Sequence, residues 1–297
     1  MMENVGFIGT GVMGLRMAKN VLRAEYPVTA YDTRPEPLRE LKALGAQVAV
    51  SCRSVGEASD VVIVMVANAA QVEAVLFGED GLAGGMNPGG VVVIMSTIEP
   101  TAVKHFSERI AVRGIEVIDA PVVRGVPAAE AGTLGILTGG AEGIVDRLRP
   151  LLGTMGDVFH CGDIGSGEVV KIVNNFIIIN TTLLIAEGML TGVKYGIDAE
   201  KLVDFLKAGS ANSWILGYWS DMVLNRKFDP PMFDTGMALK DTGLALSTAR
   251  DLDVPMPVGT LCHQILRMAG SQGREKLDYT AAAAWMEDLA GVTIAKA

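Results

Sequence analysis

The segment VGFIGTGVMGLRMAKNVL places a glycine-rich turn between a short apolar run and a helical pattern. Apolar residues at Met13, Met17 and Val21 recur at helical spacing, so the predicted order is strand, tight turn and helix. Glycines allow the turn, the approach of backbone to a pyrophosphate, and close helix packing, while the helix N-terminus offers N–H groups to phosphates. The predicted dinucleotide contacts in this turn are Gly9, Thr10, Gly11, Val12, Met13 and Gly14.

A second strand pattern, VTAYD, ends at Asp32, eighteen residues after Gly14. An acid at this distance accepts hydrogen bonds from the ribose of NAD and repels the 2′-phosphate of NADP. Asp32 could instead cap the helix that we predict from Pro35. Arg34 stands close by and can accommodate a phosphate, so the sequence predicts NAD and leaves NADP open.

Continuous apolar runs follow at 61–66 and 91–96, as expected for central strands covered on both faces. Residues 115–119 and 134–140 extend the same sheet. This alternation of strands and helices predicts an α/β fold, with a Rossmann-type doubly wound sheet as a dinucleotide-binding domain over residues 1–163.

Two polar residues, Asn68 and Thr97, come just after two of these strand patterns. Open parallel sheets bind ligands at the edge where the strands end, so both residues are candidates for cofactor contacts. Either residue can instead cap a neighbouring helix, and the sequence does not separate the two roles.

The second half of the chain changes character, because the alternation of strands and helices does not continue beyond residue 163. Long helical patterns take over and predict an all-helical domain over residues 164–297, for substrate binding and oligomerisation. Segments with proline interrupt these patterns. The predicted helices span about 167–195, 198–208, 212–224, 233–252, 257–272 and 278–290.

Three aromatic residues lie about one turn apart in the predicted helix 212–224. They are Trp214, Tyr218 and Trp219. They could wall a ligand pocket, but aromatic residues at helical spacing more often belong to a core or an interface.

Charge and composition argue against several classes of protein. The formal net charge of −9 argues against a nucleic-acid binder and favours an acidic cytoplasmic protein. The three cysteines and three histidines are dispersed, so we predict no metal site. The chain starts without the basic region of a secretory signal, so we expect no such signal. The charge-free run Ile172–Ala186 is shorter than the roughly 20 residues of a membrane span, so we expect no membrane partner.

One helix pattern carries polar residues where the chain otherwise builds core. Lys171, Asn174 and Asn175 stand at the head of GSGEVVKIVNNFIIIN, and their spacings of three and four put them on one face of a helix. A solvated lysine with two capping amides would explain the pattern in structural terms alone. A lysine half-buried in a cleft would instead have a lowered pKa, which suits proton transfer.

Four segments together resemble the β-hydroxyacid dehydrogenase family, which includes 3-hydroxyisobutyrate dehydrogenase. They are GFIGTGVMG, DAPVVRGVPAAEAGTL, GSGEVVKIVNN and KDTGLAL, in the family's order and spacing, and the resemblance covers essentially the whole chain. It implies a Rossmann-type domain, a helical domain of the 6-phosphogluconate dehydrogenase type and an active site between them. It also implies an NAD(P) cofactor, a small anionic substrate, and a homodimer or homotetramer.

Carried over by position, the resemblance assigns roles to four residues. Lys171 matches the catalytic lysine and Asn175 a substrate-holding asparagine. Lys240 matches a lysine near the nicotinamide and substrate, and Thr97 a residue beside the nicotinamide ribose. The implied reaction interconverts a 3-hydroxy acid and its semialdehyde, with the lysine exchanging the hydroxyl proton as hydride leaves or joins the adjacent carbon.

The predicted substrate loop departs from the family's usual Asp-Ala-Pro-Val-Ser-Gly-Gly. Its last three positions are Val123, Arg124 and Gly125, so a serine has become valine and a glycine has become arginine. In one explanation Arg124 grips the substrate's anionic group, and a similar arginine occurs in the sulfolactaldehyde reductase branch, where it is associated with a sulfonate. In the other, Arg124 pairs with an acid such as Glu130 and the substrate is bound elsewhere.

Two other functions compete with the hydroxyacid dehydrogenase prediction. Imine-reducing relatives generally lack a lysine at this helix position, so Lys171 argues against that activity. A non-catalytic nucleotide-binding protein would have no use for a proton shuttle, so Lys171, Asn175 and Lys240 together argue against it.

Overall fold

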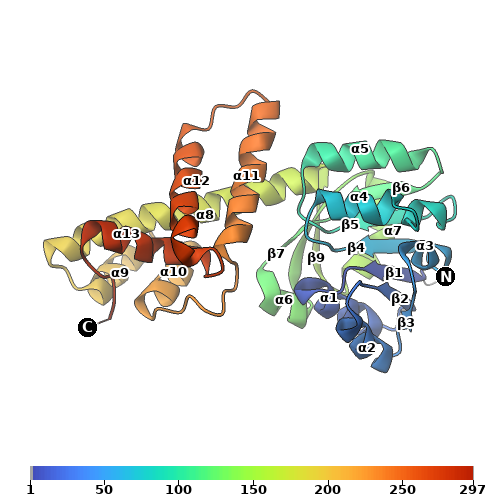
Figure 1. Cartoon of the computed structure of the whole chain (residues 1–297), viewed down its shortest axis with the longest axis horizontal. Coiled ribbons are helices and arrows are strands. Elements are labelled where there is room, and N and C mark those ends of the chain that lie inside the picture. Colours follow the sequence, from blue (N-terminus) through green and yellow to red (C-terminus); the bar gives the residue numbers. More distant parts are fainter. Residues whose placement is uncertain (1–2, 297) are drawn as a thin grey trace. The chain divides into compact units, whose positions relative to one another are not determined.

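The computed structural model of the chain describes residues 3–296, which form two compact units (Figure 1). The first unit ends at Lys171 and the second begins at Ile172. Among the described residues, the strands all belong to the first unit and the second is helical, which confirms the predicted fold class. The domain boundary predicted between residues 163 and 164 stays a prediction.

The first unit is built on one nine-stranded sheet. Its strands are β1 (Val5–Ile8), β2 (Val28–Tyr31), β3 (Gln47–Val48), β4 (Val61–Val64), β5 (Val91–Ile94), β6 (Glu116–Asp119), β7 (Val122–Val123), β8 (Leu134–Gly139) and β9 (Gly156–Gly162). Their order is β3-β2-β1-β4-β5-β6-β8-β7, with β9 paired to β8. Neighbours from β3 to β6 are parallel, whereas β8 runs antiparallel to both β6 and β7.

The apolar runs predicted as strands form β4, β5, β6 and β8, and all residues of β4, β5 and β8 are buried. The sequence did not predict β3, β7 or β9. β3 and β7 are only two residues long, and β9 contains no fully buried residue. Short or half-exposed strands lack the apolar pattern by which a strand is recognised.

Helices cover both faces of the sheet (Figure 1). One core cluster packs the sheet against α1 (Val12–Arg23), α2 (Pro35–Ala43), α6 (Gly125–Ala131) and α7 (Glu142–Leu152). A second cluster packs the other face against α3 (Cys52–Glu57), α4 (Ala69–Phe77), α5 (Pro100–Ala111) and the 3-10 turn Leu82–Gly84. Burial on both faces explains why the central strands are continuously apolar.

The carboxyl ends of the central strands lie in one row. Ile8 pairs with both Tyr31 and Val64, Val64 pairs with Ile94, and Ile94 pairs with Asp119. The strand order reverses direction between β1 and β4, and open α/β sheets place ligands at such a switch point. The loops that leave this row therefore hold the candidate cofactor residues.

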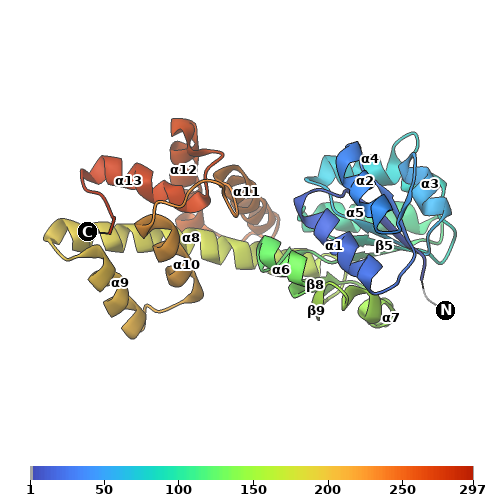
Figure 2. The same cartoon turned by 90° about the horizontal axis from the view of Figure 1, so that it is seen from below.

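The second unit consists of helices seen at two angles in Figures 1 and 2. They are α8 (Ser166–Tyr195, shared with the first unit at its start), α9 (Ala199–Ala208), α10 (Trp214–Leu224), α11 (Thr235–Asp251), α12 (Pro257–Ala269) and α13 (Ala282–Ala290), with a π turn at Gly270–Arg274 and a 3-10 turn at Tyr279–Ala281. The predicted helices match within a few residues. Side chains of Asp198, Ser213 and Asp234 cap α9, α10 and α11 by accepting backbone N–H groups.

By length and apolar composition α8 could cross a membrane, and no other described helix could. This is weak evidence, because the core helix of a globular domain passes the same test. Ile179, Leu183, Ala186 and Met189 of α8 belong to the hydrophobic core of the helical unit. Part of α8 is therefore core, as the sequence predicted.

The aromatic residues of α10 do not share one environment. Trp219 is fully buried in the helical core, whereas Trp214 is 69% exposed and stacks on Tyr218 at a centroid distance of 5.5 Å. The Tyr218 hydroxyl donates to Asp278 at 2.6 Å. Trp219 thus follows the core alternative, and Tyr218 anchors α10 to the segment that precedes α13.

Replacing Trp219 should destabilise the helical unit strongly. We expect Trp219→Ala to cost about 3–5 kcal/mol, because it empties a fully buried aromatic site. Trp214→Ala on the same helix is the matched control and should cost about 1 kcal/mol or less, because it loses little more than a ring stack. Urea unfolding followed by circular dichroism measures both, and equal losses would contradict the assignment of Trp219 to the core.

Candidate active site

The glycine turn has the geometry that a dinucleotide-binding turn needs. Gly9 has a φ of +90°, in the region that favours glycine. A Cβ on Gly14 would overlap the carbonyl oxygen of Gly9, so the start of α1 can pack on the turn only with glycine there. Gly11 is the N-cap of α1 and makes no side-chain cap, and no acid lies in the first helical turn.

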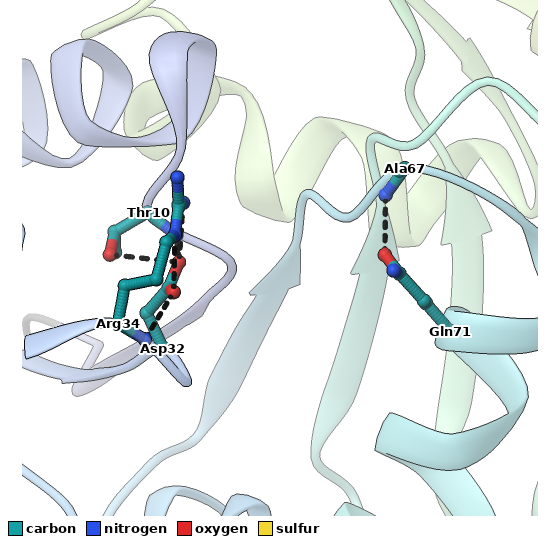
Figure 3. Close-up of polar contacts among 5 residues, drawn as sticks. All are labelled: Thr10, Asp32, Arg34, Ala67 and Gln71. Carbon is teal, nitrogen blue, oxygen red and sulfur yellow. Dashed lines mark hydrogen bonds and ion pairs between the residues drawn. The ribbon is translucent and has the colours of Figure 1, made fainter.

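Asp32 is hydrogen-bonded both to this turn, through Thr10, and to Arg34 at the start of the following helix (Figure 3). Its Oδ2 accepts the Thr10 N–H at 2.7 Å and the Thr10 hydroxyl at 3.2 Å, and its Oδ1 accepts the Arg34 N–H at 2.9 Å. Both oxygens also accept from the Arg34 guanidinium, and Arg34 rather than Asp32 is the N-cap of α2. Burial raises the pKa of Asp32, but the hydrogen bonds from Arg34 and Thr10 outweigh burial and hold the pKa below its ordinary value.

Asn68 caps α4, because its side chain accepts the Gln71 N–H at 2.9 Å. Gln71 in turn accepts the Ala67 N–H at 2.9 Å, a contact drawn in Figure 3. The Asn68 side chain is therefore used in the way the capping alternative predicted, and a cofactor contact for Asn68 stays a prediction. Thr97 lies half-buried after β5 at the same edge of the sheet.

These residues fit a nicotinamide dinucleotide. Gly9, Gly11 and the N–H groups at the start of α1 would hold the pyrophosphate, since the turn leaves room for backbone approach and the helix start bears no competing acid. Asp32 would hold the adenine ribose, because its carboxylate lies beside the turn and is kept ionised. Thr10 is fully buried, and Val12 is 64% exposed at the first position of α1.

The predicted substrate loop begins at the end of β6. Val123 is half-buried in β7 and pairs with Gly135 of β8. Arg124 has a φ of +83° and Gly125 a φ of +70°, so both adopt left-handed backbone conformations. Arg124 thus occupies a backbone conformation that favours glycine. Glycine is also the residue at this position in the usual loop sequence of the β-hydroxyacid dehydrogenase family.

Arg124 pairs with Asp157 of β9, at 2.6 Å between Nη1 and Oδ2, and also donates to the Thr133 carbonyl at 2.9 Å. The side chains are 46% and 65% exposed. The alternative in which Arg124 pairs with an acid is therefore what the structure shows, but the acid is Asp157 and not Glu130, which pairs with Arg16 of α1 at 3.0 Å. β9 was not predicted as a strand, so the sequence did not show that it brings Asp157 to Arg124.

Lys171 lies half-buried in the second turn of α8. The start of this helix is attached to the sheet by Asp119, whose carboxylate accepts the N–H groups of Gly165 and Glu168. Burial raises the pKa of Asp119, although these N–H groups act in the opposite direction. The predicted catalytic lysine therefore belongs to a helix whose start is fixed to the end of β6.

In the helical unit, Asp241 joins two predicted site residues. The Asn175 amide donates to Asp241 at 2.6 Å, and Lys240 Nζ lies 3.3 Å from the other carboxylate oxygen. Asn175 is 5% and Asp241 3% exposed. Asn174 donates to the Asn175 oxygen at 3.1 Å, so its amide serves the neighbouring side chain. Sequence reasoning missed Asp241, although it follows Lys240 directly in KDTGLAL.

Two family models match the chain. The NAD binding domain of 6-phosphogluconate dehydrogenase matches residues 4–165, which is more than half of the chain. The NAD-binding domain of NADP-dependent 3-hydroxyisobutyrate dehydrogenase matches residues 165–286. The chain belongs to the β-hydroxyacid dehydrogenase family.

Full-length relatives agree with this assignment. The chain is 35% identical to mitochondrial 3-hydroxyisobutyrate dehydrogenase of Rattus norvegicus, over 93% of this chain and 84% of the relative. It is 34% identical to 2-hydroxy-3-oxopropionate reductase of Escherichia coli, over 98% and 99%. The structure of Mycobacterium tuberculosis 3-hydroxyisobutyrate dehydrogenase with L-serine superposes with a TM-score of 0.89 at 28% identity, over 96% and 99% of the two chains.

This β-hydroxyacid dehydrogenase is therefore an NAD(P)-dependent oxidoreductase that acts on a CH–OH group. Over residues 3–296, no group of three or more histidine, cysteine or acidic side chains could hold a metal ion. The three cysteines are free thiols.

Proposed function

We propose that this enzyme interconverts a small 3-hydroxy acid and its semialdehyde with NAD, and that Lys171 is its general acid and base. The names of the two relatives support the substrate class. Both 3-hydroxyisobutyrate and 2-hydroxy-3-oxopropionate are carboxylates whose reducible or oxidisable oxygen is on carbon 3. The substrate is therefore a small anion in which the reacting carbon lies two bonds from the carboxylate carbon.

The observation that carries this proposal is the polar group in which Asp241 accepts a hydrogen bond from Asn175 and forms an ion pair with Lys240. Asn175 lies four residues after Lys171 on α8, which places both on one face of the helix. The Asn175 nitrogen donates to Asp241 and the Asn175 oxygen accepts from Asn174, so both ends of the amide are held in one orientation. A buried amide held in one orientation is suited to bind a substrate rather than to cap a helix.

Lys171 supplies the proton chemistry. When bound, the nicotinamide takes or gives the hydride. In the oxidation direction a neutral Lys171 amine accepts the proton of the substrate hydroxyl, and in reduction the ammonium returns it to the carbonyl oxygen. Asn175 and Lys240 hold the substrate by hydrogen bonds and charge.

The preference for NAD follows from Asp32. Its carboxylate is ionised beside the glycine turn, where it would accept from ribose hydroxyls and repel a 2′-phosphate. Arg34, which could otherwise attract that phosphate, is engaged by the same carboxylate.

We further propose that Arg124, together with the backbone of Val123 and Gly125, binds the anionic end of the substrate. Its exposed ion pair with Asp157 is worth only about 0–1 kcal/mol, so a substrate anion can replace Asp157 at small cost. A sulfonate would satisfy the same guanidinium, which keeps a hydroxysulfonate as the alternative substrate.

Association through the helical unit is also part of this proposal. Val173, Ile177 and Leu184 of α8 are each at least half exposed, as are Val258 and Leu261 of α12. Large apolar side chains exposed at helical spacing favour burial in a homodimer or homotetramer. The cytoplasmic location stays a prediction.

Lys171→Ala should lower turnover at least about a hundredfold, since a general acid–base group contributes roughly that much. NAD affinity should survive, because the glycine turn and Asp32 are untouched. Stopped-flow or steady-state NADH absorbance measures turnover, and fluorescence titration measures NAD binding. Turnover near that of the parent enzyme would remove the proposed mechanism.

Asp32→Ala should shift cofactor preference from NAD toward NADP. The substitution removes the ribose acceptor and releases Arg34, which then attracts the 2′-phosphate. The measurement is the ratio of kcat/KM for the two cofactors, with Asp60→Ala as a surface control in the same unit. An unchanged ratio would mean that Asp32 serves only to brace the glycine turn.

Arg124→Ala should raise KM for the anionic substrate at least about tenfold, the loss expected for one charge-assisted contact. KM for neutral alcohols should change far less. Asp157→Asn is the matched variant, and it should leave KM for the anion unchanged or lower it, because it frees the guanidinium. If Asp157→Asn raises KM as much as Arg124→Ala does, the pair is structural and the substrate is bound elsewhere.

A further inference from the structure

A buried carboxylate joins the sheet to the helix that carries Lys171. Asp119 is the last residue of β6 and is fully buried, with 0% of its surface exposed. Its Oδ1 accepts the Gly165 N–H at 2.6 Å and its Oδ2 accepts the Glu168 N–H at 2.8 Å. These donors lie 46 and 49 residues later in the chain, at the start of α8.

This contact does for α8 what an N-cap side chain does for other helices. The first N–H groups of a helix have no partner within the helix, and a negative charge near them is favourable. Asp119 supplies two acceptor oxygens, and both are in use. An asparagine of the same shape would offer one acceptor and would turn an NH₂ group toward a backbone N–H.

The surroundings leave the carboxylate no room to move. A Cβ on Gly139 of β8 would overlap Oδ1, and a Cβ on Gly167 of α8 would lie 2.7 Å from Oδ2. Two glycines therefore let strand and helix close on Asp119 from both sides. A carboxylate held between them fixes the height and rotation of the first turn of α8.

We propose that Asp119 is a positioning residue for Lys171, an inference that rests on the proposed role of that lysine. Lys171 is three residues after Glu168, one turn along a continuous helix. As the last residue of β6, Asp119 also directly precedes the segment that leads through β7 to Arg124. One side chain thus sets the place of the proton-transfer group relative to the substrate loop.

The test measures turnover, cofactor binding and helix order in Asp119→Asn and Gly139→Ala. We expect kcat to fall about 10- to 100-fold in Asp119→Asn, because a misplacement of about 1 Å at a reacting group can cost 10²-fold. Gly139→Ala should give a smaller loss in the same direction, since its methyl displaces Oδ1. The Kd for NAD should stay within about threefold, and hydrogen–deuterium exchange should quicken over residues 165–171.

Asp198→Ala is the matched control. Asp198 caps α9 by accepting the Lys201 N–H at 3.0 Å, far along the chain from the proposed machinery. Removing this cap should lower the midpoint of urea unfolding slightly and leave kcat within about twofold. Equal losses of kcat in Asp198→Ala and Asp119→Asn would reduce the role of Asp119 to stability and overturn the inference.

The double variant Lys171→Ala/Asp119→Asn separates positioning from an independent effect. If Asp119 acts through Lys171, the double variant should be no slower than Lys171→Ala alone, because residues that act as a unit are non-additive. A tenfold lower kcat in the double variant than in Lys171→Ala would overturn the inference. A normal kcat in Asp119→Asn would overturn it too, as would failure of both Asp119→Asn and Gly139→Ala to fold. If Lys171→Ala itself keeps normal turnover, the proposed function fails, whatever the Asp119 variants show.

Discussion

The in-register ends of five parallel strands are the constraint on which the rest of the first unit depends. β1, β2, β4, β5 and β6 are each four residues long and pair without offset, so their loops leave from one row. A shift of one residue would turn each strand's buried side chains to the opposite face. The glycine turn, Asp32 and the loop from Asp119 can lie along one edge only because this register is fixed.

Buried acidic side chains fix the positions of several other groups through hydrogen bonds. A buried carboxylate is costly unless it is hydrogen-bonded, so a buried acid with such bonds fixes where its donors lie. Asp119 holds the start of α8, Asp241 holds Asn175 and Lys240, and Asp278 holds Tyr218. Asp241 thus contacts two side chains that we propose for substrate binding, and Asp119 fixes the start of the helix that carries Lys171. The positions of Asn175, Lys240 and the start of α8 therefore depend on hydrogen bonds and ion pairs to buried acids as well as on apolar packing.

The sequence predicted what depends on local pattern. The glycine turn, the six strands β1, β2, β4, β5, β6 and β8 and the six helices of the second unit follow from periodicity, and the lysine and asparagine of α8 stood out against an apolar run. Pairings between distant residues could not be predicted. Asp119 is 49 residues from its partner Glu168, and Asn175 is 66 residues from its partner Asp241. Arg124 is 33 residues from its partner Asp157. Such pairs arise only when topology brings elements together, and β9, which carries Asp157, has too little buried surface to mark itself as a strand.

The conformational strain of Arg124 and the contacts it makes within the chain nearly balance, which favours a role in binding a ligand. A non-glycine residue in a left-handed conformation costs about 1–2 kcal/mol, a strain that glycine avoids. The exposed pair with Asp157 returns about 0–1 kcal/mol, and the hydrogen bond to Thr133 about another 1 kcal/mol. These terms roughly cancel, so stability gives no net reason for arginine at this position. A side chain that is neutral for folding, carries a cationic fork of donors and lies in the loop that we propose to bind the substrate is suited to bind an anion.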